Sequence, residues 1–479
     1  MVGKTYWLAG SALALLVAAA TAMAADLPAP APVYKAAPPV VAPINWTGFY
    51  IGAGTGNASW NANTSVATPG GAALFGTNSQ GGSGWLGTVV TGYDYQLDRV
   101  VVGVLGAYDF AGVKGFYSDP GSAGAGVVAP NEGVMKESSA WIAGARIGWL
   151  VFPEFLAYVS AGYSQAHFSA FGLTPTGDAI PSHTYSGWFV AIGAETTFPL
   201  LGNGWFFRSD YRFAQYDTAS LANVTPAGTV ADIQTIRPSV QTVSAALIYK
   251  FNATPTLPSL SSFSIMDFLR PAVPGPTRWT GFYLAGGGGY GIWHAGTSSL
   301  SPTGAPIAGD TQSGRGWFGT VNAGYDYQLT SRIVAGVFGD FDFANIRGTF
   351  QDQATVAPGL TGTMSEHNAW YAGLRGGWLN TPQILSYYDV GYTQANFGSV
   401  NLSGVTTLGS QTYSGWFVGT GLETSLPFLG NNWFGRIEYR YASYRNVNTS
   451  ALFASGAVAD IISFQPRIET LRTAIVYKF

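Results

Sequence analysis

The chain has 479 residues, of which only 10% are charged, 15% are aromatic and 64 are glycine. Ordinary soluble domains carry about 25% charged residues, so this chain has too few charges to cover a water-soluble protein of its size. The net charge of −3 comes without a Lys/Arg run, which argues against a nucleic-acid partner, and the absence of cysteine excludes disulfides, Cys-ligated metals and a lipoprotein anchor.

The N-terminus has the pattern of an export signal over residues 1–24. Lys4 gives a positive start, an apolar core follows from 7 to 20, and the letters AMA before residue 25 fit the cleavage pattern. Residues 25–45 are rich in Pro and Ala, which predicts an extended periplasmic segment. No other stretch has about 18 consecutive apolar residues, so no helical membrane span is predicted after cleavage.

The remaining chain contains the same unit twice. The repeated segments include WTGFY (46–50 and 279–283), GWLGTVVTGYDYQL from 84 with GWFGTVNAGYDYQL from 316, TYSGWFV (from 184 and from 412), and YKF ending at 251 and at 479. A period of about 230 residues is too long for a solenoid repeat or a propeller blade. We therefore expect two domain-sized units, 46–251 and 279–479, joined by a Pro-rich linker, 252–278.

Each copy contains eight stretches long enough for the 9 to 11 residues of a tilted membrane-crossing strand. They are 47–59, 84–97, 99–111, 138–151, 154–169, 185–198, 204–217 and 239–251 in the first copy, and 280–293, 316–329, 331–344, 367–379, 384–398, 413–426, 432–445 and 467–479 in the second. The connections 60–83, 112–137, 170–184 and 218–238 are long and rich in small residues, and they alternate with short ones. Short periplasmic turns and long external loops are typical of outer-membrane barrels.

The predicted fold is therefore an all-β, transmembrane, antiparallel up-and-down β-barrel. Two tandem eight-stranded units are the main expectation, because each copy has its own eight strands and its own terminal YKF. One sixteen-stranded barrel is the alternative, in which the apolar residues of 261–269 could serve as a plug.

Strand alternation assigns the charged side chains to the interior. Along 204–217, Arg208, Asp210 and Arg212 alternate with apolar side chains, and lipid-facing residues of a barrel alternate with interior ones. The same parity in the other strands gives this lumen charge network: Asp109, Arg146, Glu195, Arg208, Asp210, Arg212, Asp342, Arg375, Glu423, Arg436, Glu438 and Arg440. Its first-copy members are three positive and three negative, as expected where buried charges must pair.

Aromatic residues near strand ends or on the apolar face are expected to form girdles at the two membrane interfaces. In the first copy these are Trp85, Trp149, Tyr158, Tyr163, Trp188, Tyr211, Tyr249 and Phe251.

The WTGFY opening after a Pro/Ala-rich spacer, the GYDYQ hairpin, the GAE strand and the YKF terminus resemble the outer-membrane immunogenic, porin-family small β-barrel proteins of alphaproteobacteria. The resemblance covers 46–251 and again 279–479. It implies eight-stranded barrels in the bacterial outer membrane, a terminal aromatic, here Phe479, as the assembly signal, and a structural or surface-antigen role. Hemin binding or porin activity is suggested for some members. This chain departs from the family pattern by carrying two copies, so the strand count and any pore stay open.

Catalytic, metal and cofactor chemistry is weakly represented, and we expect no enzyme, metal site or cofactor. The four histidines show no metal-ligand spacing. His167 and Ser169 could form a nucleophile pair on one strand face, but the second copy has Asn-Phe-Gly there. For hemin, His183 and His367 are candidates only by their location on external loops.

Three functions are compared: a structural, surface-exposed envelope protein, a diffusion porin through one sixteen-stranded barrel, and ligand binding by external loops. The first is preferred because the lumen charges neutralise one another. The expected partners are outer-membrane lipid and the barrel-assembly machinery.

Overall fold

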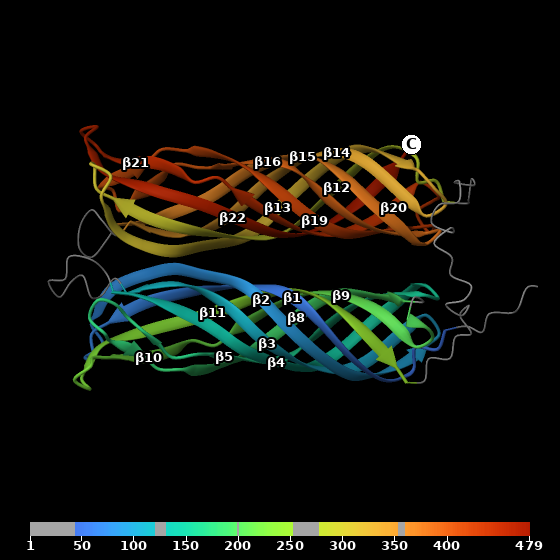
Figure 1. Cartoon of the computed structure of the whole chain (residues 1–479), viewed down its shortest axis with the longest axis horizontal. Helices are drawn as coiled ribbons and strands as arrows, with labels where there is room; N and C mark the ends of the chain where they lie inside the picture. The colour runs from blue at the N-terminus through green and yellow to red at the C-terminus, as the bar shows by residue number, and fades with distance from the viewer. Residues whose placement is uncertain (1–43, 120–130, 199–200, 252–276, 353–359) are drawn as a thin grey trace, which may run out of the picture. The chain divides into compact units, whose positions relative to one another are not determined.

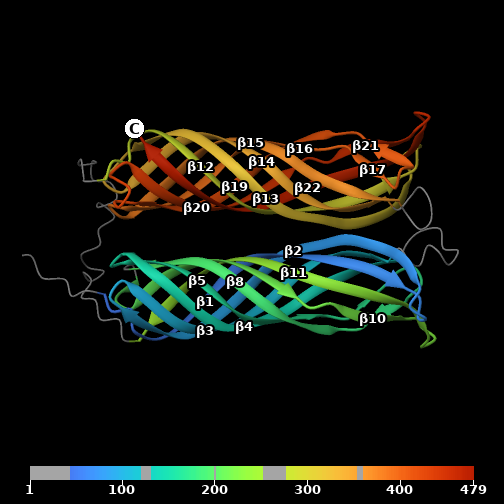
Figure 2. The same cartoon turned by 180° about the vertical axis from the view of Figure 1, so that it is seen from behind.

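The computed structural model describes residues 44–119, 131–198, 201–251, 277–352 and 360–479 (Figures 1 and 2). The predicted export signal, most of the Pro/Ala-rich segment and most of the linker lie outside the described residues. Within the described ranges, no helix is long and apolar enough to cross a membrane.

The first copy is built from antiparallel strands, drawn blue to green in Figure 1. They are β1 (Gly48–Ala67), β2 (Ala73–Leu97), β3 (Val100–Asp119), β4 (Asn131–Phe152), β5 (Phe155–Phe168), β6 (Phe171–Gly172), β7 (Ala179–Ile180), β8 (His183–Thr197), β9 (Trp205–Tyr216), β10 (Ala219–Val224) and β11 (Val230–Lys250). The long strands pair in chain order, and β1 also pairs with β11, beginning with Tyr50 opposite Lys250. The ladder therefore returns to its first strand and closes a ring of eight long strands within the described part of this copy.

The second copy repeats this plan, drawn yellow to red in Figure 1. Its strands are β12 (Gly281–Leu300), β13 (Pro306–Gln328), β14 (Ile333–Asp352), β15 (Leu360–Thr381), β16 (Ile384–Phe397), β17 (Val400–Leu402), β18 (Thr406–Leu408), β19 (Gln411–Ser425), β20 (Trp433–Tyr444), β21 (Val447–Phe453) and β22 (Val458–Lys478). Here β12 pairs with β22, beginning with Tyr283 opposite Lys478. A single sixteen-stranded ring would instead pair β11 with β12, and the described residues contain no such ladder.

The strands extend further toward the external end than predicted. The first strand was expected to end at 59, but β1 continues to Ala67, and the turn to β2 takes only 68–72. Much of the predicted external loops is therefore strand. Gly, Ser, Thr, Asn and Ala dominate these segments and resemble loop by composition, but ladder hydrogen bonds join backbone groups and need no particular side chain.

Burial alternates along the strands. This is expected of a ring whose inner face is packed with side chains and whose outer face is exposed to lipid. In β20 every second residue from Phe434 to Tyr444 is buried. On the outward face of β4, Trp141 and Trp149 are both exposed and lie eight positions apart. At about 3.3 Å per residue and a tilt of about 40° this spacing is about 20 Å along the membrane normal, close to the apolar band of outer-membrane barrels.

A bulge reverses the side-chain parity in the external half of β4. Glu137 lies opposite Phe168 and Ser139 lies opposite His167, so Ser138 is an extra residue in the ladder. Because side chains alternate with a period of two, one extra residue moves those beyond it to the other face. Glu137 consequently faces the lumen, where it is buried. The equivalent bulge of β15 has His367 as its extra residue and buries Glu366.

Candidate functional site

Five charged side chains from five strands meet in the first lumen, near the end with the short turns. They are Asp94 on β2, Arg146 on β4, Glu195 on β8, Arg208 on β9 and Lys250 on β11. Arg146 donates from Nε to Asp94 Oδ1 at 2.8 Å and from Nη1 to Glu195 Oε2 at 3.1 Å. Lys250 Nζ lies 2.5 Å from Asp94 Oδ2 and 3.0 Å from Glu195 Oε1. Arg208 Nη2 lies 2.7 Å from Glu195 Oε2, the oxygen that Arg146 also contacts. Every cation of this lower charge cluster therefore has a carboxylate partner.

Two tyrosine rings cover the guanidinium groups of the lower charge cluster. The Cζ atom of Arg146 lies 4.9 Å from the ring centres of both Tyr50 and Tyr158, and Arg208 lies 4.6 Å from Tyr50. Contacts of this kind are favourable when the cation is removed from water. The prediction that Tyr158 belongs to an outer girdle is wrong, because its side chain points inward, is buried and donates a hydrogen bond to Asp210.

Trp46, the first residue of the WTGFY motif, closes the first lumen at the end with the short turns. It is fully buried, and its indole Nε1 donates to the carbonyl of Pro153 at 3.0 Å. Its ring lies 4.9 Å from that of Phe206 and 5.0 Å from Lys250 Nζ. In the second copy Trp279 donates to the carbonyl of Pro382 at 2.9 Å. The repeated motif thus places one buried tryptophan, here called the stopper, across the same end of each lumen.

The middle of the first lumen holds the remaining predicted charges of that copy. Arg212 pairs with Asp109, and its Nη2 is 3.4 Å from Thr242 Oγ1. The predicted set of three positive and three negative charges is wrong as a count, because it omits residues that the structure also places in the lumen. In the lower and middle parts of the lumen these additional residues are Asp94, Glu137 and Lys250, which give five acidic and four basic side chains there. Asp119 and Asp232 are buried further toward the external end.

The second lumen repeats the lower charge cluster with equivalent residues. They are Asp326, Arg375, Glu423, Arg436 and Lys478. Arg375 Nε donates to Asp326 Oδ1 at 2.7 Å and Nη1 lies 2.9 Å from Glu423 Oε2. Arg436 Nη2 lies 2.8 Å from Glu423, and Lys478 Nζ lies 2.6 Å from Asp326 and 2.9 Å from Glu423. The sequence analysis did not predict Asp94 and Lys250 or their counterparts Asp326 and Lys478. Each of these residues recurs at the same place in the two copies.

The middle of the second lumen carries more charge than that of the first. Arg440 Nη1 is 2.6 Å from Asp340, and its Nη2 is 3.1 Å from Asp389 and 2.6 Å from Glu438. Arg472 Nη2 is 2.6 Å from Asp342. The new charges are Asp340, Asp389 and Arg472, which stand where the first copy has Ala107, Ser160 and Ser244. The inward parity of Asp340 could have been read from its strand, because it shares the face of the predicted Asp342. The strands of Asp389 and Arg472, β16 and β22, carry no predicted charge.

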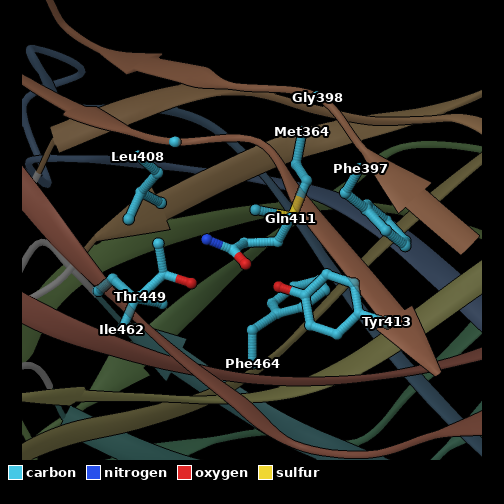
Figure 3. A pocket seen from close by; sticks show the side chains of 10 residues that line it. Met364, Phe397, Gly398, Leu408, Gln411, Tyr413, Thr449, Ile462 and Phe464 are labelled. Carbon is cyan, nitrogen blue, oxygen red and sulfur yellow. The ribbon is translucent and has the colours of Figure 1, made fainter.

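Aromatic and other apolar side chains share the external half of each lumen with buried polar and charged side chains, such as Asn223 and Gln234 in the first ring. In the first ring Trp60, Tyr117, Phe168 and Tyr185 are all buried in one cluster. In the second ring Figure 3 shows aromatic, methionine and polar side chains around a cavity of ≈ 10 Å³, which has room for about one water molecule. Its labelled lining residues include Met364, Phe397, Gln411, Tyr413 and Phe464. The β17–β18 hairpin, paired with β21, buries Leu402 and Leu408 at the same end.

Phe479, the predicted assembly signal, lies at the end of β22 with its side chain on the outside. The residue is 58% exposed, and its backbone N–H donates to the carbonyl of Phe282 at 2.9 Å. The C-terminus therefore lies at the end of the second ring opposite the end that holds β21 (Figure 1).

All four histidines lie on strands of the two rings. His167 Nδ1 is 2.9 Å from Thr184 Oγ1 on the outer surface, and Ser169 follows the end of β5. The prediction that His183 and His367 lie on external loops is wrong. His183 begins β8 and His367 is the bulge residue of β15. Within the part of the chain that the structure describes, no group of three His, Cys, Asp or Glu side chains has an arrangement that could hold a metal ion.

A closed antiparallel ring with an apolar outer surface, aromatic levels at two heights and an interior of paired charges is an outer-membrane β-barrel. The chain matches the sequence pattern of the outer membrane protein beta-barrel domain over residues 11–251 and 260–456, and it belongs to that family. It is a bacterial outer-membrane protein.

Two relatives of similar sequence are named as outer-membrane proteins. The 31 kDa outer-membrane immunogenic protein of Brucella melitensis is 30% identical over 42% of this chain and 84% of its own length. The 25 kDa outer-membrane immunogenic protein of Brucella canis is 29% identical over 50% of this chain and 98% of its own. Among solved structures, Neisserial surface protein A is 16% identical, covers 43% of this chain and 98% of its own, and has a TM-score of 0.21.

Proposed function

We propose that this protein is a structural, surface-exposed component of the outer membrane whose two lumens are closed to diffusion. The role is that of a surface antigen and envelope protein, and it involves no catalytic step. On this proposal the barrel-assembly machinery inserts the chain and recognises the terminal strand that ends in Phe479.

The observation that carries this proposal is the burial of the lower charge cluster. The side chains of Asp94, Arg146 and Glu195 have 0% of their surface accessible, and that of Lys250 has 1%. A continuous water path through the ring would expose these groups, because they lie on strands all around its wall. Trp46 and the packed side chains of the external half close the lumen on either side of them.

The closest competitor is a diffusion porin, in which the same charges would line a water-filled channel. The two functions predict different electrical behaviour. Full-length protein refolded into planar lipid bilayers should show no large, steady unit conductance, since the charged groups are paired with one another and sealed from water. Steady conductance steps that follow ion size and charge would contradict the closed-lumen role and support the porin.

A protein without catalytic activity also needs no activated nucleophile. His167 is the histidine considered as a partner of Ser169, and its Nδ1 lies 2.9 Å from Thr184 Oγ1 on the outer surface. A His167→Ala variant should therefore leave assembly and surface display unchanged.

A further inference from the structure

Among the described residues, each lumen contains one buried glutamate that has no cation partner. Glu137 of β4 and Glu366 of β15 are only 3% and 2% exposed. Neither carboxyl has a described Lys, Arg or His nitrogen within 4.0 Å, and the Oε2 atom of each lacks a described hydrogen-bond partner. Glu195, which is also buried, has three cations within 3.1 Å. Glu137 and Glu366 are therefore unlike the glutamates of the lower charge clusters.

Each of these two glutamates reaches the lumen because its strand has a bulge. Side chains alternate between the two faces of a strand, so the extra residue, Ser138 or His367, moves the glutamate from the outer face to the inner one. The sequence neighbours Lys136 and His367 are exposed. Both copies keep the bulge and its glutamate, although the extra residue differs. A buried carboxyl at this position is therefore a repeated feature of the unit.

The groups around Glu137 leave it without a free cation. Asp109 of β3 and Arg212 of β9 are the charged groups that act on it, and Arg212 is paired with Asp109. Tyr216 of β9 is the neighbouring titratable hydroxyl, and it is hydrogen-bonded to the Ser164 hydroxyl of β5 at 2.9 Å. An ionised Glu137 would therefore add a second carboxylate beside one that already uses the local guanidinium.

The second lumen repeats this arrangement around Glu366. The charged groups that act on Glu366 are Asp342 of β14 and Arg472 of β22. Arg472 directs Nη1 and Nη2 to the two oxygens of Asp342, at 3.0 and 2.6 Å. Tyr371 of β15 and Tyr444 of β20 are the neighbouring titratable hydroxyls. Here too the local guanidinium is engaged by another carboxylate.

A carboxylate that is removed from water without a cation partner is strongly unfavourable, and such a group takes up a proton instead. We propose that Glu137 and Glu366 are proton-binding sites, each uncharged at neutral pH, and that their protons keep the external half of each lumen packed. Release of either proton to solvent leaves an unpaired charge in the packed region, and water must enter to solvate it. The closed state of each ring therefore depends on pH. This inference rests on the closed lumens of the proposed function.

The first test is infrared spectroscopy of the full-length protein folded in lipid vesicles at neutral pH. A neutral carboxylic acid and a carboxylate absorb at different frequencies, so a difference spectrum between wild type and variant reports the protonation of the substituted groups. The variant combines Glu137→Gln with Glu366→Gln, because glutamine has the shape of the neutral acid. The wild type should show an additional neutral-acid band from two carboxyls. Asp98→Asn, which changes an exposed carboxyl on the turn between β2 and β3, should leave that band unchanged.

The second test is conductance in planar bilayers between about pH 5 and about pH 9. A proton that binds the closed lumen but not the open one changes the ratio of the two states by about tenfold per pH unit. Openings of the wild type should therefore become up to about tenfold more frequent per pH unit, and level off where the closed lumen also releases its proton. The combined glutamine variant should show no such rise.

The outcomes separate this proposal from the proposed function. Absence of a neutral-acid band from the difference spectrum would overturn the proton sites, and so would a band that appears only after divalent cations are chelated, because the carboxyls would then hold a metal ion. Equal pH dependence of opening in wild type and variant would overturn the link to the closed state. Large, steady conductance of both proteins at every pH would instead contradict the closed lumens, while the infrared spectra would still decide the protonation of the two groups.

The single variants cover the case in which the combined variant loses its heat-modifiable fold. Glu137→Gln and Glu366→Gln are then measured separately. Each should remove half of the neutral-acid band, and retention of the whole band in both would overturn the proposal.

Discussion

Glu195 and Arg208 lie directly opposite each other on β8 and β9, with Arg208 Nη2 2.7 Å from Glu195 Oε2 and both side chains sealed from water. Glu423 and Arg436 repeat this relationship in the second copy at 2.8 Å. Removing one partner of such a pair leaves an uncompensated charge in a medium of low dielectric constant, which is strongly unfavourable.

We expect Arg208→Ala to destabilise the first ring by about 3–5 kcal/mol, because the carboxylate of Glu195 loses one of its cations. Urea unfolding of the full-length protein in lipid vesicles, followed by tryptophan fluorescence, measures this change. Arg99→Ala removes an exposed arginine and should cost little. Unchanged stability of Arg208→Ala together with altered ion selectivity would point to a water-filled lumen.

Trp46→Ala should destabilise the first ring by about 3–5 kcal/mol, since a fully buried indole and its hydrogen bond to Pro153 are lost together. The control is Trp85→Ala, because Trp85 is 72% exposed on the lipid side. Comparison of heat-modifiable migration at rising temperatures gives the two melting points. Equal effects of the two substitutions would show that Trp46 is not a stopper.

Deletion of Phe479 should reduce surface levels more than Phe49→Ala does. Both phenylalanine side chains face outward, and Phe479 and Phe49 are 58% and 64% exposed. Simple loss of lipid contact therefore predicts similar effects for the two changes. An assembly signal predicts a larger effect at the C-terminus, where the terminal strand is recognised. Surface biotinylation measures the level, and normal display without Phe479 would rule out its role as a signal.

The inward face of each strand was predictable where long charged side chains alternate with apolar ones. Arg208 and Arg212 lie on such a strand, and the structure brings each to a carboxylate. Asp94 and Lys250 lie near strand ends beside aromatic residues, and they were not among the charges that alternation assigned to the lumen. The prediction of an outer-girdle position for Tyr158 was wrong because an aromatic residue of a barrel can also stack on an interior arginine, here Arg146.

Glu137 and Glu366 could not be found by parity alone. A one-residue bulge lies between each of them and the regular part of its strand, and the bulge exchanges the two faces. Strand ends were missed because small polar residues give no alternation in hydrophobicity, although their backbone groups continue the ladder. Bulges and strand ends depend on pairing with a neighbour, which a single sequence does not display.

The central structural claim is that each copy closes on itself, β1 with β11 and β12 with β22. Its most direct test is to express residues 26–251 and 277–479 separately, each behind an export signal, and to assay each half for heat-modifiable migration and protease resistance in the outer membrane. Closed rings predict that each half folds alone and shows both properties. Failure of both halves to fold, while the full-length chain folds normally, would contradict two self-contained rings and favour one sixteen-stranded barrel.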